Sequence, residues 1–303
     1  MGADEKPVIM FGGKGGVGKT TCAAATALGY AGLQVNTLVI STDPTPSLAD
    51  IFEVRGTEKP IRISDNLHLA ELGIDEVKDL WHQRFGREVY EVFSSMVSIE
   101  YDEFVDFITS ILPGLQEEFM VDYIRDLVDE ARYEKIIWDT APLGQTMHLL
   151  NMPGMMLEHL KPAPRIYSRL KLGGISRRPI LKILEEWSVL SQLDIRFLCD
   201  KVEYKLVTIP EALAVAQING IIAEFSRHGF GFSEVIVNNV IMSPDSEFLK
   251  SKSDQQQAYI ERIQRLCAGR KIRKLPLFQY EIMGIDRLRE IAARLFAKTG
   301  ADL

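Results

Sequence analysis

The stretch that decides the fold is VIMFGGKGGVGKTTCAAATALGYA, which runs from Val8 to Ala31. It predicts a buried strand, then a glycine-rich loop, then an alanine-rich helix. The phosphate-loop pattern G-x-x-x-x-G-K-[ST] is matched by Gly13, Gly18, Lys19 and Thr20. Glycines let backbone N–H groups approach phosphate oxygens, and the positive end of the following helix faces the anion. We therefore expect nucleotide phosphates to bind between Gly12 and Thr20.

Each side chain of this loop has an expected role. Lys19 is expected to reach the β- and γ-phosphates, and the Thr20 hydroxyl to bind Mg²⁺. A second lysine, Lys14, gives the spacing K-G-G-V-G-K-T that marks the deviant P-loop ATPases. In that group the extra lysine crosses a dimer interface to the partner's nucleotide. The predicted nucleotide contacts are Gly13, Lys14, Gly15, Gly16, Val17, Gly18, Lys19, Thr20 and Thr21.

Apolar runs that end in polar or glycine-rich turns recur along the chain. The predicted strands are Pro7–Phe11, Val35–Ser41, Leu67–Ala70, Lys135–Asp139, Tyr204–Thr208, Glu234–Val240 and Ile272–Leu275. Several are continuously apolar, which favours a buried parallel sheet. Helical patterns lie between them, one of them after Pro210, which suits a first helical turn. This alternation predicts an α/β fold with a doubly wound, mainly parallel sheet of the P-loop NTPase type.

Two stretches break the alternation, at about residues 75–132 and 147–201. Both have helical patterns and lack an obvious core strand. We expect them to form an α-helical subdomain inserted into a single P-loop ATPase domain that spans residues 1–303. The 303 residues are enough for one α/β domain with such an insertion.

Composition excludes several classes of protein. A formal net charge of -7 argues against nucleic acid as the main partner. The three cysteines, Cys22, Cys199 and Cys267, form no C-x-x-C pair, so no zinc or iron–sulfur site is expected and a reducing compartment fits. No signal peptide and no apolar run of membrane-spanning length is visible. We expect a cytoplasmic protein that is not an integral membrane protein.

With these motifs, nearly the whole chain resembles the arsenite-pump and tail-anchored-protein-targeting ATPases (ArsA-like), most closely the single-domain archaeal-type targeting members. STDPTPSLADIF, Ser41 to Phe52, is similar to the family's first switch. The resemblance implies that Asp43 orients the attacking water and makes Asp43 and Lys14 the catalytic candidates. IIWDTAPLGQTMHLL, Ile136 to Leu150, resembles the second switch, where Asp139 would hold Mg²⁺ through water.

Further segments carry the resemblance toward the base of the nucleotide. LVTIPEALAV places Glu211 at the family's nucleotide-contacting glutamate, and VIVNNVIMS places Asn238 at the asparagine that reads adenine. KLPLF resembles the loop that packs on the base, which makes Pro276 and Leu277 candidates. The sequence departs from the family pattern in its switches. These departures are Pro46, Leu143 and Gln145, where His, Thr and His are common.

The phosphate loop implies ATP as substrate with Mg²⁺, but it does not identify the cargo. Apolar side chains gather in the two insertions, and methionine suits surfaces that accept varied apolar partners. The candidate client contacts are Phe104, Phe107, Ile108, Ile111, Met120, Met152, Met155 and Met156. The same residues are equally consistent with a core for the helical subdomain itself.

The resemblance implies a homodimeric switch that delivers a hydrophobic transmembrane helix to a membrane receptor. Three alternatives stay open. The chain could be the ATPase subunit of an arsenite or anion efflux pump, although a soft metalloid requires several thiolates. It could serve metal-cofactor maturation, for which His148 and His159 are the available hint. It could also be a partition or division-site ATPase, although that class lacks large helical insertions.

Overall fold

The computed structural model describes residues 5–43, 45–55, 60–72, 86, 90, 100–101, 103, 115–162 and 178–297. Contacts divide the chain into two compact units. The first comprises Met1–Glu71, Ala131–Thr146 and Lys201–Leu303, and the second comprises Leu72–Glu130 and Met147–Asp200. The sequence predicts that the two insertions of the helical subdomain span about residues 75–132 and 147–201, the ranges to set beside this second unit.

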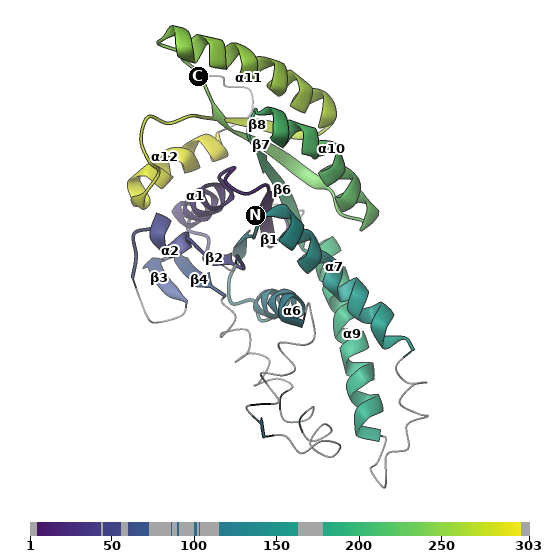
Figure 1. Cartoon of the computed structure of the whole chain (residues 1–303). Helices are drawn as coiled ribbons and strands as arrows, with labels where there is room; N and C mark the ends of the chain where they lie inside the picture. The colour runs from purple at the N-terminus through teal and green to yellow at the C-terminus, as the bar shows by residue number, and fades with distance from the viewer. Residues whose placement is uncertain are drawn as a thin grey trace. The chain divides into compact units, whose positions relative to one another are not determined.

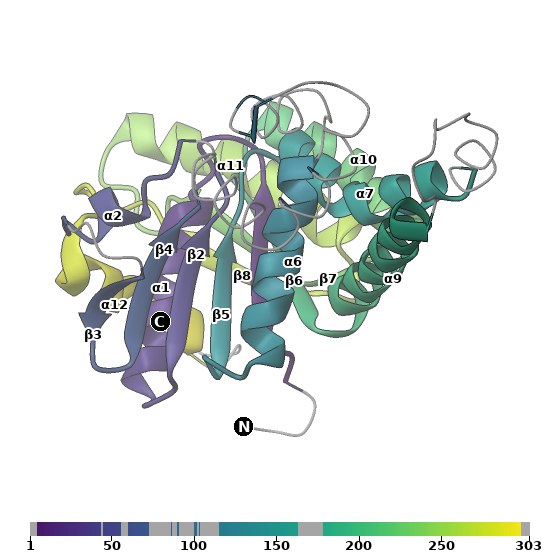
Figure 2. The same cartoon turned by 90° about the horizontal axis from the view of Figure 1, so that it is seen from below.

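The first unit is built on an eight-stranded sheet with the order β3-β4-β2-β5-β1-β6-β7-β8 (Figure 1). Its described strands are β1 Val8–Gly13, β2 Thr37–Ser41, β3 Ile61–Ser64, β4 Leu67–Glu71, β5 Lys135–Asp139, β6 Val202–Thr208, β7 Phe232–Val240 and β8 Lys271–Pro276. Every ladder is parallel except the pairing of β3 with β4. Figure 2 shows β4, β2 and β5 side by side. The predicted α/β fold with a mainly parallel sheet is therefore confirmed.

The sequence did not predict β3. Its residues alternate between half-buried and exposed, as expected for an antiparallel strand at the edge of a sheet. A search for continuously apolar runs misses such a strand, because half of its side chains face water.

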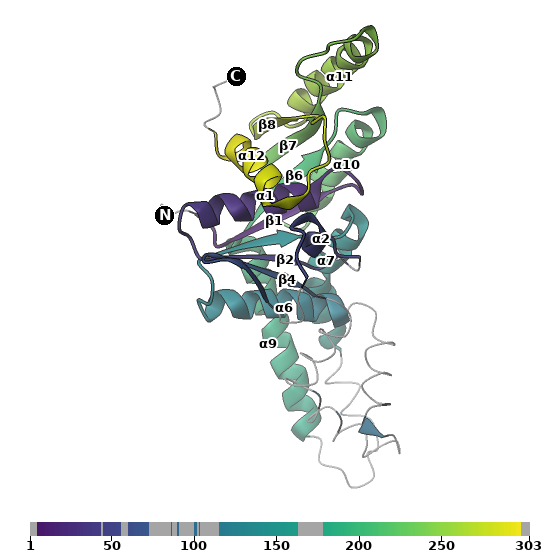
Figure 3. The same cartoon turned by 90° about the vertical axis from the view of Figure 1, so that its left-hand side faces the viewer.

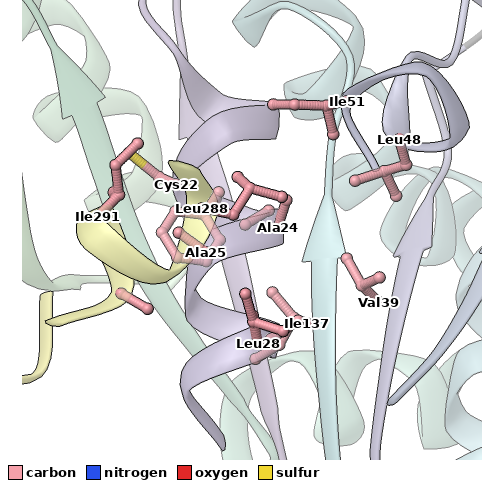
Figure 4. Close-up of a cluster of buried hydrophobic side chains, with 14 of the residues drawn as sticks. Cys22, Ala24, Ala25, Leu28, Val39, Leu48, Ile51, Ile137, Leu288 and Ile291 are labelled. Atoms are coloured by element: carbon pink, nitrogen blue, oxygen red, sulfur yellow. The ribbon is translucent and has the colours of Figure 1, made fainter. Parts of the chain in front are cut away.

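Helices α1 (Lys19–Gly32) and α12 (Gly284–Phe296) pack on each other over one face of the sheet (Figure 3). Figure 4 shows the buried core beneath them, where Ala24 and Ala25 of α1 lie near Leu288 of α12. Small side chains on α1 let the two helices approach closely. The short helix α2 (Leu48–Ile51) adds Leu48 to the same core.

The other face of the sheet is covered around β6 and β7 by α10 (Ala212–Arg227), which also contacts α11 (Glu247–Leu266). The Phe225 ring of α10 lies 4.2 Å from that of Phe232 and 5.6 Å from that of Tyr204, measured between centroids. Pro210 is not in the first turn of this helix, as the sequence suggested. The helix begins at Ala212 with Glu211 as its N-cap, so Pro210 precedes the cap.

The second unit contains α6 (Leu115–Asp129), α9 (Arg178–Asp200) and most of α7 (Leu143–Leu160). Helices α6 and α9 are joined by the buried Arg125 guanidinium, which forms ion pairs with Asp122 on its own helix and with Asp194 on α9. A buried arginine needs such partners, because leaving it unpaired costs several kcal/mol (~3–5). Throughout the described ranges, no helix has the length and apolarity needed to cross a bilayer.

A second buried ion cluster lies in the first unit and joins β6, β7 and β8. Glu234 accepts hydrogen bonds from Lys205 and Arg273, each at 2.9 Å, and its Oε1 lies 3.3 Å from the Lys271 ammonium. Burial alone would raise the pKa of Glu234. The cations outweigh that effect and hold its pKa below the usual range.

We predict that this cluster makes the fold sensitive to acid. Glu234→Gln should lower the free energy of unfolding at pH 7 by about 3 kcal/mol, because it leaves buried cations without their anion. A depressed carboxylate pKa contributes stability that is complete above the unfolded pKa of about 4.3 and is lost as the pH falls toward the folded pKa. The difference between the variant and the wild type should therefore shrink below about pH 4.

The measurement is chemical denaturation at a series of pH values. Glu203→Gln is the control, because Glu203 is more exposed and lies 3.9 Å from Lys205. It should cost under about 1 kcal/mol. Equal losses for the two variants would contradict the assignment of Glu234 as the anion of the cluster.

Candidate functional site

The glycine-rich loop follows β1, which lies at the centre of the sheet between β5 and β6. In open α/β sheets, ligands bind at the carboxyl ends of the strands, at the point where the strand order reverses direction. From β1 the chain continues to β2 on one side, while β6 pairs with β1 on the other. The loop thus occupies the position at which this architecture binds nucleotides.

Two glycines of the loop are required by close packing. A Cβ atom on Gly13 would lie 2.3 Å from the backbone oxygen of Val207 on β6. A Cβ on Gly18 would lie 2.3 Å from Nδ2 of Asn238, and Gly18 also has a φ of +94°. Any other residue at these positions would displace the neighbouring backbone or the Asn238 side chain.

Lys19 is buried, and its ammonium donates a hydrogen bond to the backbone oxygen of Lys14 at 3.2 Å. Burial lowers the pKa of Lys19, while the nearby carboxylates of Asp139 and Asp43 act in the opposite direction. The side chain of Lys14, by contrast, is exposed. The loop therefore presents one cation inside the site and one at the surface.

Asp139, at the carboxyl end of β5, is buried beside the loop. Its Oδ2 accepts a hydrogen bond of 2.9 Å from the Thr20 hydroxyl. Its Oδ1 is buried and has no hydrogen-bond partner among the described residues. Burial raises the pKa of Asp139 to about 7, against the opposing effects of Thr20 and Lys19.

A buried carboxylate oxygen without a partner is the donor that a hard cation requires. The Thr20 hydroxyl and the Asp139 carboxylate are thus the oxygen ligands available for Mg²⁺ beside the phosphate loop. The ion would neutralise phosphate charge, and Asp139 would orient it directly or through a water molecule. In the described part of the chain, no group of three or more His, Cys, Asp or Glu residues could hold a metal ion.

The segment after β2 carries Asp43. Its Oδ1 accepts hydrogen bonds from the backbone N–H and the hydroxyl of Thr45, at 3.0 and 3.1 Å. Two hydrogen bonds join the preceding residue, Thr42, to β5. The Trp138 indole donates to the Thr42 hydroxyl at 2.9 Å, and the Thr42 N–H donates to the Asp139 backbone oxygen at 3.1 Å. The base of the first switch is therefore fixed to the strand that carries Asp139.

Threonine hydroxyls also organise the second switch. Thr140 donates to the backbone oxygen of Phe11 on β1 at 2.7 Å, and Thr146 donates to the Ala141 oxygen at 2.7 Å. These bonds connect β1 with the first turn of α7, which includes the departures Leu143 and Gln145. Thr42, Trp138, Thr140 and Thr146 were not singled out from the sequence. A sequence signal was available for two of them, because Thr42 precedes Asp43 and Thr140 follows Asp139, the two aspartates selected by the resemblance.

Residues expected near the base lie at the carboxyl ends of β6, β7 and β8. Nδ2 of Asn238 donates to the Val17 backbone oxygen at 3.0 Å, so this side chain contacts the phosphate loop directly. The Leu277 N–H donates to the Val240 oxygen at 2.8 Å, next to Pro276 at the end of β8. Glu211 is exposed at the N-cap of α10. The structure thus places Asn238 at the phosphate loop and the other three on neighbouring strand ends.

The candidate client contacts belong to the second unit. Met120 and Met152 are buried, Met156 is partly buried and Met155 is half exposed. The remaining four, Phe104, Phe107, Ile108 and Ile111, lie outside the described residues. On α9, Val189 and Leu193 are exposed apolar side chains one helical turn apart. The sequence analysis did not select this pair.

Comparison with known proteins identifies relatives along the whole chain. The model of a family described as anion-transporting ATPase matches residues 6–297. A putative arsenical pump-driving ATPase of Prosthecochloris vibrioformis is 28% identical, over 96% of this chain and 76% of the relative. An ATPase named GET3A from Arabidopsis thaliana is 27% identical, over 93% of this chain and 81% of the relative. An ATPase ASNA1 homolog of Dictyostelium discoideum is 28% identical, over 93% of this chain and 87% of the relative.

The geometry predicts that binding and chemistry can be separated. Asp43→Asn should bind ATP nearly as the wild type does and hydrolyse it about 100-fold more slowly or worse, because the amide no longer orients water as a carboxylate does. Lys19→Ala should instead raise the dissociation constant for ATP. Asp50→Asn, an exposed carboxylate of α2, is the control and should change neither quantity.

Nucleotide binding is measured with a fluorescent ATP analogue and turnover by phosphate release. Wild-type turnover in Asp43→Asn would show that this carboxylate has no catalytic role.

Proposed function

The chain belongs to the anion-transporting ATPase family, and from this premise we propose that it is a homodimeric switch that binds and delivers an apolar client. It is an ATP-hydrolysing enzyme, as its relatives among the arsenical pump-driving and GET3 ATPases are. The proposed client is the transmembrane helix of a tail-anchored membrane protein, which a membrane receptor then accepts. The proposed place of work is the cytoplasm.

One observation supports the proposal above the others. Helix α7 begins at Leu143, four residues after Asp139, and continues to Leu160 with Pro153 inside it. The division between the two units falls inside it, between Thr146 and Met147. A change at the second switch would therefore act on a helix that also carries Met152, Met155 and Met156. A helix that belongs to both a nucleotide switch and a helical unit would couple them, and Pro153 gives it a point at which it can bend.

The reaction follows from groups of the first unit. The loop N–H groups and Lys19 would bind the β- and γ-phosphates, and the Thr20 and Asp139 oxygens would hold Mg²⁺ against them. Asp43 would accept a hydrogen bond from the attacking water and orient it toward the γ-phosphorus. In the structure the Asp43 Oδ1 accepts hydrogen bonds from Thr45. A carboxylate has about four acceptor sites, so Thr45 would orient the group while it also meets the water.

The second lysine motivates the proposed dimer. Lys14 is exposed on the phosphate loop, and a symmetric pair of chains facing each other at this edge would bring it to the partner's nucleotide. That arrangement would add one positive charge at the developing negative charge of the transition state. The dimer is proposed to form without structural zinc, because the sequence contains no C-x-x-C pair.

We expect ATP to drive dimer formation. Sedimentation velocity should show mainly monomer, or a weak dimer, without nucleotide and a dimer with a non-hydrolysable ATP analogue and Mg²⁺. Lys14→Ala should keep ATP binding and lose most turnover, whereas Lys274→Ala, an exposed lysine of β8, should behave as the wild type. A monomer under both conditions contradicts the dimer. Stoichiometric zinc in the dimer contradicts its metal-free form.

The helical unit is the proposed client-binding part. Met155, Val189 and Leu193 are exposed apolar side chains on α7 and α9, with exposures of 50%, 50% and 42%. Val189 and Leu193 lie one turn apart on α9 and would meet an apolar partner together, and methionine adapts to varied shapes. Met120 and Met152 are buried in this structure, so they could contact a client only after the helices rearrange.

The client prediction is tested by photo-crosslinking a tail-anchor helix to the ATP-bound, hydrolysis-deficient Asp43→Asn protein. Capture should require nucleotide and should fall about ten-fold when Met155, Val189 and Leu193 are changed to Asp, because each charge opposes an apolar contact. Leu33→Asp is the control, since Leu33 is an exposed apolar residue of the first unit. Equal capture by the variant and the control, or no capture with stimulation of turnover by arsenite or another metal, would reject this client.

A further inference from the structure

The loop that follows β7 is held by one side chain of α11. Oε1 of Gln256 accepts a hydrogen bond from the Ile241 N–H at 2.8 Å, and its Nε2 donates to the Asn239 backbone oxygen at 2.9 Å. An N–H needs an acceptor and a carbonyl needs a donor, so these two partners fix the orientation of the carboxamide. A single glutamine thus satisfies backbone groups on both sides of Val240.

The backbone needs this support because β7 is irregular at this point. In its ladder with β8, three steps along β7, from Val237 to Val240, correspond to two steps from Lys274 to Pro276. The extra residue makes a bulge, and Asn239 within it has a φ of +57°. A left-handed residue other than glycine costs about 1–2 kcal/mol, and a bulge leaves ladder groups without strand partners. Gln256 supplies partners for two of them.

Asn238 lies within this irregular stretch, between Val237 and Val240. Nδ2 of Asn238 donates to the Val17 backbone oxygen at 3.0 Å, so the side chain is directed at the phosphate loop. The Asn238 amide carries two N–H donors, so with one of them engaged by Val17 the second N–H and Oδ1 remain to meet a ligand. Adenine presents an exocyclic amino donor at the position where guanine presents the acceptor O6. An amide that presents Oδ1 to this amino group and its free N–H to the adjacent ring nitrogen would pair with adenine, whereas Oδ1 would oppose O6 of guanine.

We infer that Gln256 is a positioning residue for base selectivity, one that holds the β7 bulge so that the Asn238 amide meets adenine in the proposed nucleotide site. This inference rests on the proposed function, because it requires ATP to bind at the phosphate loop. Gln256 acts through the backbone of Asn239 and Ile241 and does not itself touch the nucleotide. Ser253, one helical turn earlier, donates a longer bond of 3.4 Å to the Ile241 oxygen and supports the same loop.

The neighbouring residue provides a matched control. Gln257 is exposed, and its amide donates to Glu261 on the surface of the same helix at 3.3 Å. Gln257→Ala therefore removes the same kind of side chain from the same helix without touching the loop after β7. Gln256→Ala removes both loop bonds. Gln256→Glu keeps the acceptor for the Ile241 N–H and replaces the donor to the Asn239 oxygen with an acceptor, at nearly unchanged volume.

The experiment measures kcat and KM for ATP and for GTP with the wild type and the three variants, together with their melting temperatures. In Gln256→Ala the KM for ATP should rise about ten-fold, the equivalent of one to two net hydrogen bonds, while kcat changes by less than about two-fold. The KM for GTP should change little, so selectivity for ATP should fall by about the same factor. Gln256→Glu should show a smaller shift in the same direction, and Gln257→Ala should match the wild type.

Two groups of results would overturn the inference. The first is a wild type that does not discriminate ATP from GTP. The second concerns the two Gln256 variants. They would overturn the inference if they kept the wild-type selectivity, whatever their melting temperatures, or if they lost affinity for ATP and GTP equally. A merely structural glutamine would give that second pattern. Absence of ATP binding and hydrolysis in the wild type would instead reject the proposed function, and the inference with it.

Discussion

The nucleotide site depends on the way β1 ends. This strand lies between β5 and β6, and at Gly13 it runs so close to β6 that a Cβ atom would lie 2.3 Å from the Val207 oxygen. Only glycine fits at this position, and the glycine-rich loop that follows leaves its N–H groups available to an anion. The helix that follows starts at Lys19, which places the lysine and Thr20 in its first turn. The loop, the N-terminus of α1 and both side chains thus lie at the carboxyl end of the central strand.

The charges of the site follow from the same packing. Asp139 ends β5, the strand next to β1, so its carboxylate is buried beside the loop and hydrogen-bonded to Thr20. Burial raises the pKa of this carboxyl group and lowers that of Lys19, and one Asp139 oxygen is left without a partner. In the proposed site, Mg²⁺ would supply the cation and the nucleotide phosphates the anion that complete this arrangement. The Trp138 and Thr140 hydrogen bonds then connect both switches to β5 and β1.

Much of this architecture could be predicted from the sequence because its signals are local. An apolar run followed by a glycine loop specifies β1 and α1, and the strand Lys135–Asp139 was predicted with the bounds that the structure has. The edge strand β3 and the start of α10 were not predicted correctly, since half-exposed strands and caps have weak patterns. The contact of Asn238 with Val17, the bulge of β7 and the role of Gln256 join residues far apart in sequence, and no local pattern contains them. The roles assigned to Asp43, Glu211 and the methionines remain predictions.

The central claim is that Thr20 and Asp139 hold Mg²⁺ against a nucleotide bound by the loop. It is tested most directly by measuring ATP turnover as Mg²⁺ is titrated, for the wild type and for Asp139→Asn, with a saturating amount of ATP. The account predicts that turnover by the wild type requires Mg²⁺ and saturates with it. It also predicts that Asp139→Asn needs about ten-fold more Mg²⁺ or loses turnover altogether, because the amide oxygen is a weaker ligand for a hard cation. Turnover without any divalent ion, or the same Mg²⁺ dependence in both proteins, would contradict it.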